Sequence, residues 1–284
     1  MELSYFLVLV VLLVAGTAVA RHFKMKWHLR ENPPFDMSHW PSELPPLAEY
    51  VAGVRERAAT PCTVFTCDRA LGTHAGPLAT WIGDVVVGAP GETWPERNGR
   101  PMVGVCQFNL TQCPAVPPCL EGIALLTMFL ERQQRDNHVE WSAANGGTPE
   151  EMVIRTYTRL DELIQYADRP TLPNPYKPCA ASPALFVEHP EEYAEIEETR
   201  GKLGLPESWS VLVRDALRDE ELLDGEAVFG TKVGGWPAPI QDFIARPLAF
   251  QLGSEDAAGM MWGDAGCVFV WKDGTKWESK IECF

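Results

Sequence analysis

Short apolar runs, separated by polar and proline-rich segments, dominate the chain, and most of them have the length of a β-strand. Residues 102–110 are apolar on both faces, as in a buried strand, and residues 123–130 are predicted to be its partner strand. A buried helical turn would have the same pattern as 123–130 and stays an alternative. Period-2 alternation places Val103, Val105 and Gln107 on one face of the first run. Further strands are predicted where β-branched or apolar residues cluster, at 62–66, 152–158 and 184–188.

Helical patterns occupy several of the segments between these runs. Residues 47–58 carry apolar side chains on one side and predict a short amphipathic helix. A second short helix is expected at 160–166, directly after a predicted strand. Residues 191–203 and 210–223 predict polar, acidic helices. Residues 31–47 contain five prolines and no periodicity, so we expect a linker there.

One order of residues occurs twice along the chain: a glycine, a strand with a glutamine, a second glycine and another strand. Gln107 precedes Gly122 by 15 residues (122 − 107), and Gln251 precedes Gly266 by the same 15 (266 − 251). The interval from the first glycine to the glutamine is 24 residues in one copy and 17 in the other, so the difference falls in a loop. A fixed order at matched spacing predicts a duplicated supersecondary unit.

These patterns together predict the fold class and its boundaries. We expect an α+β fold of two related, largely antiparallel β units with linking helices, preceded by a single membrane-spanning helix. The repeat units are placed at residues 80–130 and 231–272. The predicted domains are an anchor at 1–20, a basic juxtamembrane and proline-rich linker with a short helix at 21–58, and one domain at 59–284.

The amino terminus predicts a retained membrane anchor. The stretch from Leu3 to Ala20 has no charge, and as a helix it would span roughly 27 Å, close to the ~30 Å hydrocarbon core. Four cations follow it, and by the positive-inside rule they keep the remaining chain on the cytoplasmic side of a bacterial inner membrane. These cations are Arg21, Lys24, Lys26 and Arg30. The alternative is export after signal-peptide cleavage at Ala18-Val19-Ala20, although no Lys or Arg precedes the apolar run.

The charge of the chain limits its partners. The formal net charge is −15 and the isoelectric point is about 4.8, so we expect no nucleic-acid partner because phosphates would be repelled. An acidic surface suits solubility or a basic protein partner. A run of glutamates predicts either a solvated face or a docking surface for such a partner. Its members are Glu188, Glu191, Glu192, Glu195, Glu197 and Glu198.

The eight cysteines leave two interpretations open. An even number permits disulfides if the protein is exported, whereas cytoplasmic thiols stay reduced. Cys106 and Cys267 lie inside apolar strands, where a thiol behaves as a small buried hydrophobe. None of the cysteine spacings is the Cys-x2-Cys of a zinc site. We expect no metal and no cofactor.

Several motifs together resemble the YwqG-like family of uncharacterised, mainly bacterial proteins. The similar segments are Met261–Gly266, Lys232–Pro237 with Gln241, Pro101–Leu110 and Leu120–Gly122. Asp84 departs from the family pattern, which has a second glycine there, and so does the added membrane segment. The resemblance implies a duplicated α+β fold rich in antiparallel strands. It implies no established reaction, cofactor or catalytic residue.

Four residues are candidates for binding: Gln107, Gln251, Trp262 and Asp264. A buried glutamine amide must satisfy its donors and acceptor locally, so each Gln either pins a neighbouring loop or lines a cleft between the halves. Asp264 lies between two glycines, which predicts a tight turn, or a carboxylate that binds a cation or a ligand hydroxyl. Trp262 either packs in the protein or stacks on a ligand.

The sequence therefore favours a protein that binds over one that catalyses. We hypothesise a membrane-anchored regulator or neutraliser, immunity-like in its action, of a protein partner whose identity the sequence does not give. The alternative is an enzyme or small-ligand binder with a site in the cleft between the repeats, around Asp264 and Gln251. A single aspartate without a placed partner is not a general acid/base pair, and for this reason no catalytic residue is assigned.

Overall fold

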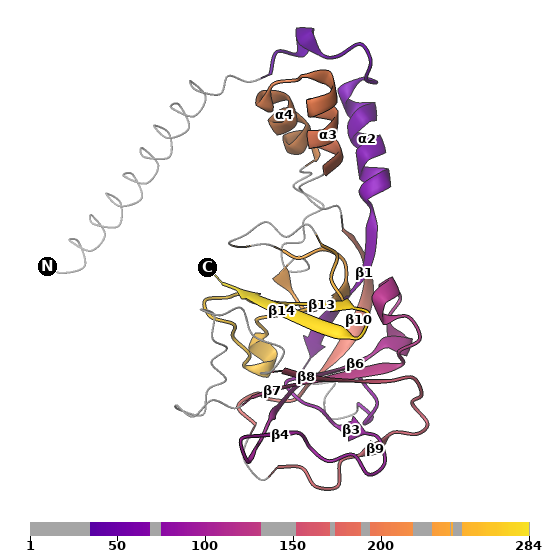
Figure 1. Cartoon of the computed structure of the whole chain (residues 1–284), viewed down its shortest axis with the longest axis vertical. Helices are drawn as coiled ribbons and strands as arrows, with labels where there is room; N and C mark the ends of the chain where they lie inside the picture. The colour runs from indigo at the N-terminus through magenta and orange to yellow at the C-terminus, as the bar shows by residue number, and fades with distance from the viewer. Residues whose placement is uncertain are drawn as a thin grey trace, which may run out of the picture. The chain divides into compact units, whose positions relative to one another are not determined.

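The computed structural model describes residues 35–68, 75–131, 152–170, 174–188, 194–217, 229–238, 240 and 246–283, shown in Figure 1. The chain divides into two compact units, one of residues 1–58 and 190–220, the other of 59–189 and 221–284. No helix within the described ranges is long and apolar enough to cross a membrane. The predicted anchor, residues 1–20, lies outside these ranges.

The first unit consists of helices around a small aromatic core. Helix α2 (Leu47–Ala58) has the predicted bounds, and α3 (Ala194–Leu203) and α4 (Glu207–Leu217) confirm the two acidic helices with shifted ends. A short 3-10 turn, η1 (Met37–His39), precedes α2. The buried residues of this core come from all of α2, α3 and α4: Tyr50, Val51, Val54, Ile196, Trp209 and Val213. The acidic helices therefore share a core with α2, across about 140 residues of sequence.

The second unit is built on a ten-stranded antiparallel sheet. Its strands are β1 (Thr60–Asp68), β2 (Trp81–Ile82), β6 (Val103–Asn109), β7 (Leu125–Leu130), β8 (Met152–Tyr157), β10 (Cys179–Glu188), β11 (Lys232–Gly234), β12 (Phe250–Gly253), β13 (Cys267–Asp273) and β14 (Lys276–Glu282). Their order is β14-β13-β12-β11-β1-β10-β2-β6-β7-β8. Two small ribbons accompany the sheet: β3 (Val87–Gly88) pairs with β9 (Ile164–Gln165), and β4 (Glu96–Arg97) pairs with β5 (Arg100–Pro101). The 3-10 turns among the described residues of this unit are η3 (Leu110–Gln112), η4 (Pro118–Leu120) and η7 (Asp256–Ala258).

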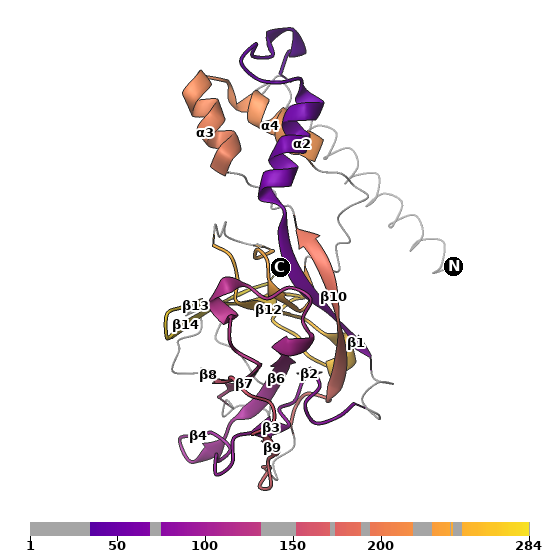
Figure 2. The same ribbon diagram turned by 90° about the vertical axis from the view of Figure 1, so that its right-hand side faces the viewer.

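The sheet has the same strand order on both sides of its centre. The central pair is β1 and β10, which lie side by side in Figure 2. Outward from β10 come β2, β6, β7 and β8, and outward from β1 come β11, β12, β13 and β14. Each series begins with a strand of two or three residues and continues with a glutamine-bearing strand. Largely antiparallel β structure, as predicted from the sequence, is confirmed.

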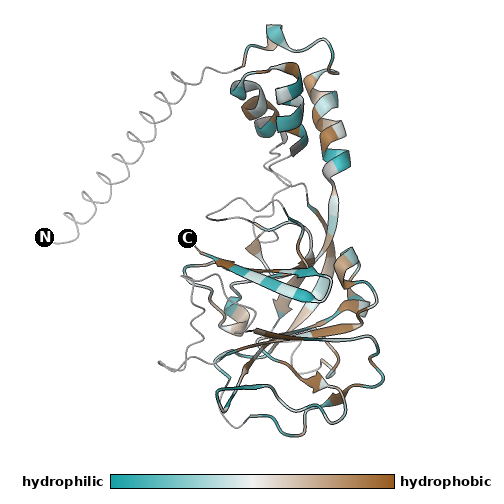
Figure 3. Ribbon diagram, viewed as in Figure 1, coloured by the Kyte–Doolittle hydropathy of each residue, from teal (hydrophilic) through white to brown (hydrophobic). Residues whose placement is uncertain are grey.

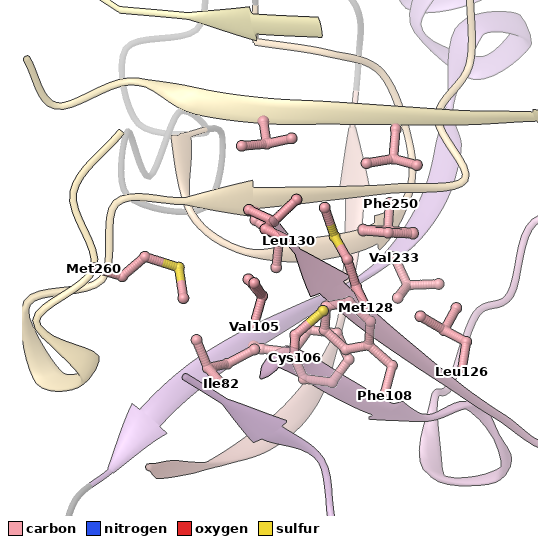
Figure 4. Packing of buried hydrophobic residues seen from close by; sticks show 14 of the residues in the cluster. Ile82, Val105, Cys106, Phe108, Leu126, Met128, Leu130, Val233, Phe250 and Met260 are labelled. Carbon is pink, nitrogen blue, oxygen red and sulfur yellow. The ribbon is translucent and has the colours of Figure 1, made fainter. Parts of the chain in front are cut away.

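The two series pack against each other, which gives the sheet a nearly closed, barrel-like form around one core (Figure 4). The rings of Phe108 on β6 and Phe250 on β12 meet edge to face, with 5.5 Å between their centroids. The ring centroid of Phe65 on β1 lies 5.0 Å from that of Phe108. Figure 3 shows the strongly hydrophobic residues concentrated on strands such as β7. Every residue of β6 and β7 is buried, as the apolar pattern predicted.

Several predicted elements need correction. The strands expected at 62–66 and 184–188 exist but are longer, at both ends of β1 and at the start of β10. The helix expected at 160–166 is wrong: these residues form a turn and then β9, because Ile164 and Gln165 pair with Gly88 and Val87. A β-bulge between Gly104 and Cys106 interrupts the simple alternation expected along β6.

Candidate functional site

Gln107 is fully buried, and its side chain binds backbone groups on both sides of the turn around Gly83. Its Oε1 accepts hydrogen bonds from the backbone N–H groups of Val86 and Val87, at 3.0 and 3.1 Å. Its Nε2 donates to the carbonyls of Pro77 and Ala79, both at 2.8 Å. The pinning role expected of this amide is therefore confirmed, because both of its ends bind backbone.

Gln251 does the same in the second half of the sheet. Its Oε1 accepts from the Ala238 N–H at 3.3 Å and its Nε2 donates to the Gly230 carbonyl at 2.8 Å. The partners fall at matched positions, four residues before and four residues after Gly83 in one turn and Gly234 in the other (79 and 87, 230 and 238). Both glycines have a positive φ, of 78° and 77°.

A threonine pair extends this match. Thr80 Oγ1 accepts from the N–H of Asn109 at 3.1 Å, and Thr231 Oγ1 accepts from the N–H of Gly253 at 3.2 Å. Each donating strand residue lies two positions after the glutamine of its strand. The turns around Gly83 and Gly234 thus share three hydrogen bonds at matched positions, and both amides bind backbone groups of the protein.

A buried ion pair supports the turn that follows Gly234. The Lys232 ammonium, with no exposed area, donates to Glu188 Oε1 and, at 2.6 Å, to the Trp236 carbonyl. Glu188 Oε2 accepts from the Trp236 N–H at 2.6 Å. A Cβ at Gly235 would overlap the Glu188 carboxylate, so only glycine fits there. Glu188 belongs to the predicted solvated glutamate run, and for this residue that interpretation is wrong, because its side chain is only 8% exposed.

The equivalent turn in the first half has the same polar arrangement from different residues. Asp84 Oδ1 accepts from the Val85 N–H at 2.8 Å. The Arg169 guanidinium donates to Asp84 Oδ1 and, at 2.8 Å, to the Val85 carbonyl. Asp84 stands where the other turn has Gly235, and it supplies from within the loop the carboxylate that Glu188 supplies from β10. The departure at Asp84 thus has a physical reason. Arg169, however, is 43% exposed, unlike Lys232.

The other two predicted binding residues lie in one turn before β13. Trp262 is 1% exposed, and its Nε1 donates to the carbonyl of Gly253 at 3.0 Å. Asp264 is exposed in the turn, between Gly263 and Ala265, which both have positive φ. Packing therefore accounts for Trp262, and turn formation for Asp264. Ligand binding by Gln107, Gln251, Trp262 or Asp264 stays a prediction, and no hydrogen bond described here joins Gln107 to Gln251.

Sequence reasoning missed a polar cluster that belongs to the first half. Glu92 Oε2 accepts from the Tyr157 hydroxyl at 2.7 Å, while Arg155 Nη1 donates to the Tyr166 hydroxyl at 2.7 Å. Burial raises the pKa of both tyrosines, and the neighbouring Glu92 carboxylate raises the pKa of Tyr157 further. Gly88 makes room, because a Cβ there would overlap Tyr166. One feature of the sequence could have indicated this cluster. The segment from Gly83 to Gln107 is seven residues longer than its counterpart in the second half (24 − 17), and it carries Glu92.

The open edge of β10 was also missed, and it is the most exposed apolar feature of the sheet. The N–H of Ala181 donates to the Thr80 carbonyl at 3.0 Å, so the odd-numbered residues of β10 direct their backbone groups away from β1. β2 covers this side only at Cys179 and Ala180. Beyond it, the N–H and carbonyl groups of Leu185 and Val187 point outward, and no described residue forms a hydrogen bond with them.

The side chains along this edge match its open backbone. Leu185 is 58% exposed and Val187 is 42% exposed. The segment from Ser182 to Val187 contains no charge, and Pro183 is its only residue without a backbone N–H. Natural sheets usually guard such an edge with charges, because it is a template for another strand. The arrangement can therefore accept a β-strand by main-chain hydrogen bonding.

Side chains that commonly bind metals do not cluster in the described ranges. These ranges contain no group of three or more His, Cys, Asp or Glu side chains that could hold a metal ion. All eight cysteines fall within them and are present as thiols. Burial raises the pKa of Cys62 and of Cys267 to about 12, so both are neutral, poor nucleophiles near pH 7.

Comparison with protein families places this sheet in a family. The family model described as "Domain of unknown function (DUF1963)" matches residues 87–274. The chain belongs to the DUF1963 family. The match includes both glutamines, the turn with Asp264 and the whole of β10, whereas β1 precedes it. No curated protein matches the chain. Within this DUF1963 chain, the open edge of β10 is the candidate functional site.

Proposed function

We propose that this protein works by binding another protein, and that the open edge of β10 is its binding surface. The observation that carries the proposal is the outward backbone of Leu185 and Val187, with which no residue in the described ranges pairs, combined with their exposed apolar side chains. An extended segment added to a sheet edge gains main-chain hydrogen bonds, and the side chains at alternate positions give selectivity. The expected ligand is an extended strand with apolar residues at alternate positions.

The charge of the chain supports a basic partner. With a net charge of −15, the protein attracts a basic protein over a distance and speeds their encounter. The edge itself is uncharged, so it can seat an apolar strand after that encounter. We propose on this basis that the protein regulates or neutralises its partner, because the segment of the partner that is bound as an added strand is no longer accessible on the partner's own surface.

We further propose that the protein is anchored in a bacterial inner membrane by residues 1–20, with the remaining chain in the cytoplasm. The uncharged run and the four cations after it support this. Protease added to intact spheroplasts should leave the domain protected and the full-length protein in the membrane fraction. A soluble species that begins at Arg21 would instead indicate a cleaved signal peptide.

A finer family relationship is also proposed, to the YwqG-like proteins, with an internal duplication of residues 80–130 and 231–272. The matched hydrogen bonds of Gln107 and Gln251 support the duplication, as does the repeated strand order. Superposition of the two segments tests it. The proposal fails if Gln107 does not lie over Gln251.

Two single variants test the binding function. Leu185→Pro removes one outward N–H and leaves the ladder to β1 intact, because the N–H of residue 185 points away from β1. Ser182→Lys is the control, since Ser182 is exposed on the same strand, three residues before Leu185, and its backbone groups face β1. The probe is a displayed library of random linear peptides, selected on the wild-type protein.

The selected peptides should have alternating apolar residues and basic flanks. Their affinity should fall about tenfold or more in Leu185→Pro and change little in Ser182→Lys. Peptides that bind both variants equally would contradict the edge as the binding surface. Peptides whose binding is lost in Asp264→Ala, with the fold retained, would favour the alternative ligand site near that turn.

A further inference from the structure

We infer that, before a partner binds, the open edge of β10 is occupied by a second copy of this chain, so that the protein is a homodimer joined by antiparallel β10 strands. This inference rests on the proposed function, because it uses the same edge. It goes further by naming the occupant and the register of the pairing.

One register pairs every outward group of Leu185 and Val187. When Leu185 lies opposite Val187 of the second copy, each pair exchanges both of its N–H···O=C hydrogen bonds across the two-fold axis. No outward N–H or carbonyl of Leu185 or Val187 is then left without a partner. Phe186 lies on the axis, opposite the same residue of the second copy, where antiparallel strands bring side chains closest.

The neighbouring register leaves a group unpaired. If Leu185 faced Leu185 of the second copy, Val187 would face Pro183, which has no N–H to donate to the Val187 carbonyl. A shift by one residue would set the outward groups of one copy against inward groups of the other. The sequence of the edge therefore selects the register that pairs Leu185 with Val187.

Charge permits this contact although each copy carries a net charge of −15. Ser182 to Val187 has no ionisable residue. Glu188, the nearest carboxylate, is buried and held by Lys232, so it does not face the second copy as an exposed anion. Apolar side chains of both copies therefore meet at the edge, and residues 182–187 add no charge there.

The test uses the full-length chain, purified in mild detergent, with mass measured by sedimentation over a range of concentrations. The wild type should be a dimer. Leu185→Pro should raise the dimer dissociation constant about tenfold or more, because each copy loses one donor. Ser182→Lys should leave it unchanged. A photo-crosslinker in place of Phe186 should join two copies at residues 185–187.

The outcomes separate the two proposals. A protein that is monomeric at all concentrations, but still binds selected peptides in a manner lost in Leu185→Pro, overturns the second copy as occupant and leaves the proposed function standing. A monomer without such peptide binding overturns both. A dimer that is insensitive to Leu185→Pro, and not crosslinked through residue 186, places the dimer contact elsewhere and also overturns this inference.

Discussion

Gln107 and Gln251 hold two separate turns through backbone atoms at the same positions, four residues before and four residues after a glycine with positive φ. Only a side chain that has both an acceptor and a donor at its end can join the two arms of such a turn. Asparagine would be shorter by one methylene, and glutamate would lack the donor. The repeated residue is therefore explained by a repeated structural task.

Replacing either glutamine with leucine should mainly lower stability. Leucine has nearly the same shape but leaves the backbone groups of the turn buried without partners, at a cost of about 1–3 kcal/mol for each variant. Gln112→Leu is the matched control, because Gln112 is exposed. Chemical denaturation measures all three. Unchanged stability together with lost partner binding would show that the glutamines act in binding instead.

Gly235 should tolerate alanine far less than Gly91 does, although both have positive φ, of 75° and 78°. At Gly91 a Cβ meets nothing within 4 Å, so only the left-handed backbone is penalised, by about 1–2 kcal/mol. At Gly235 the Cβ also overlaps the Glu188 carboxylate, which raises the expected loss to about 3 kcal/mol or more. Equal melting temperatures for the two variants would refute this account of the turn.

Much of the sheet follows from local patterns. The strand that contains Gln107, β6, and its partner β7 are short apolar runs close to glycines and prolines, a pattern typical of strands. The duplicated spacing also indicated that Gln107 and Gln251 have one role. Both features can be recognised from residue type and spacing alone, which is why the sequence was sufficient to predict them.

Features that depend on distant residues could not be predicted in this way. The helix expected at 160–166 was replaced by β9, because its partner Val87–Gly88 lies more than 70 residues away. The Lys232–Glu188 pair joins residues 44 apart, and nothing near Glu188 in the sequence distinguishes it from the other glutamates of the run. The open edge of β10 exists because β2 is only two residues long, a fact of strand order that no local pattern contains.

The two ion pairs at the equivalent turns should differ strongly in their energetic importance. Lys232→Met leaves the Glu188 carboxylate buried without its cation and should cost about 3–5 kcal/mol. Arg169→Met removes a cation that is 43% exposed, and solvent replaces it, so the loss should be about 0–1 kcal/mol. Thermal and chemical unfolding of both variants measure the contrast.

A double variant controls for the packing of the long side chain. Lys232→Met combined with Glu188→Gln removes both charges and should recover a large part of the loss seen in Lys232→Met. Glu188→Gln alone completes the comparison. The prediction is refuted if the stability loss of the double variant equals the sum of the losses in the two single variants, because the two charges would then not be coupled.

Alkaline pH should destabilise the protein through its buried thiols. The pKa values of Cys62 and Cys267 rise from the ordinary 9.0 to about 12, mainly because burial disfavours the thiolate. The unfolded chain therefore releases these protons first. The stability that the neutral thiols contribute is complete below about pH 9 and is lost as the pH rises towards 12, by about 1.4 kcal/mol per pH unit for each thiol.

Denaturation at intervals from pH 8 to about pH 11, with reductant present, should show this decline, and Cys62→Ala should reduce its slope by one proton. A wild-type stability that stays constant above pH 9, or a Cys62→Ala slope equal to that of the wild type, would show that Cys62 ionises in the folded protein as readily as in the unfolded chain.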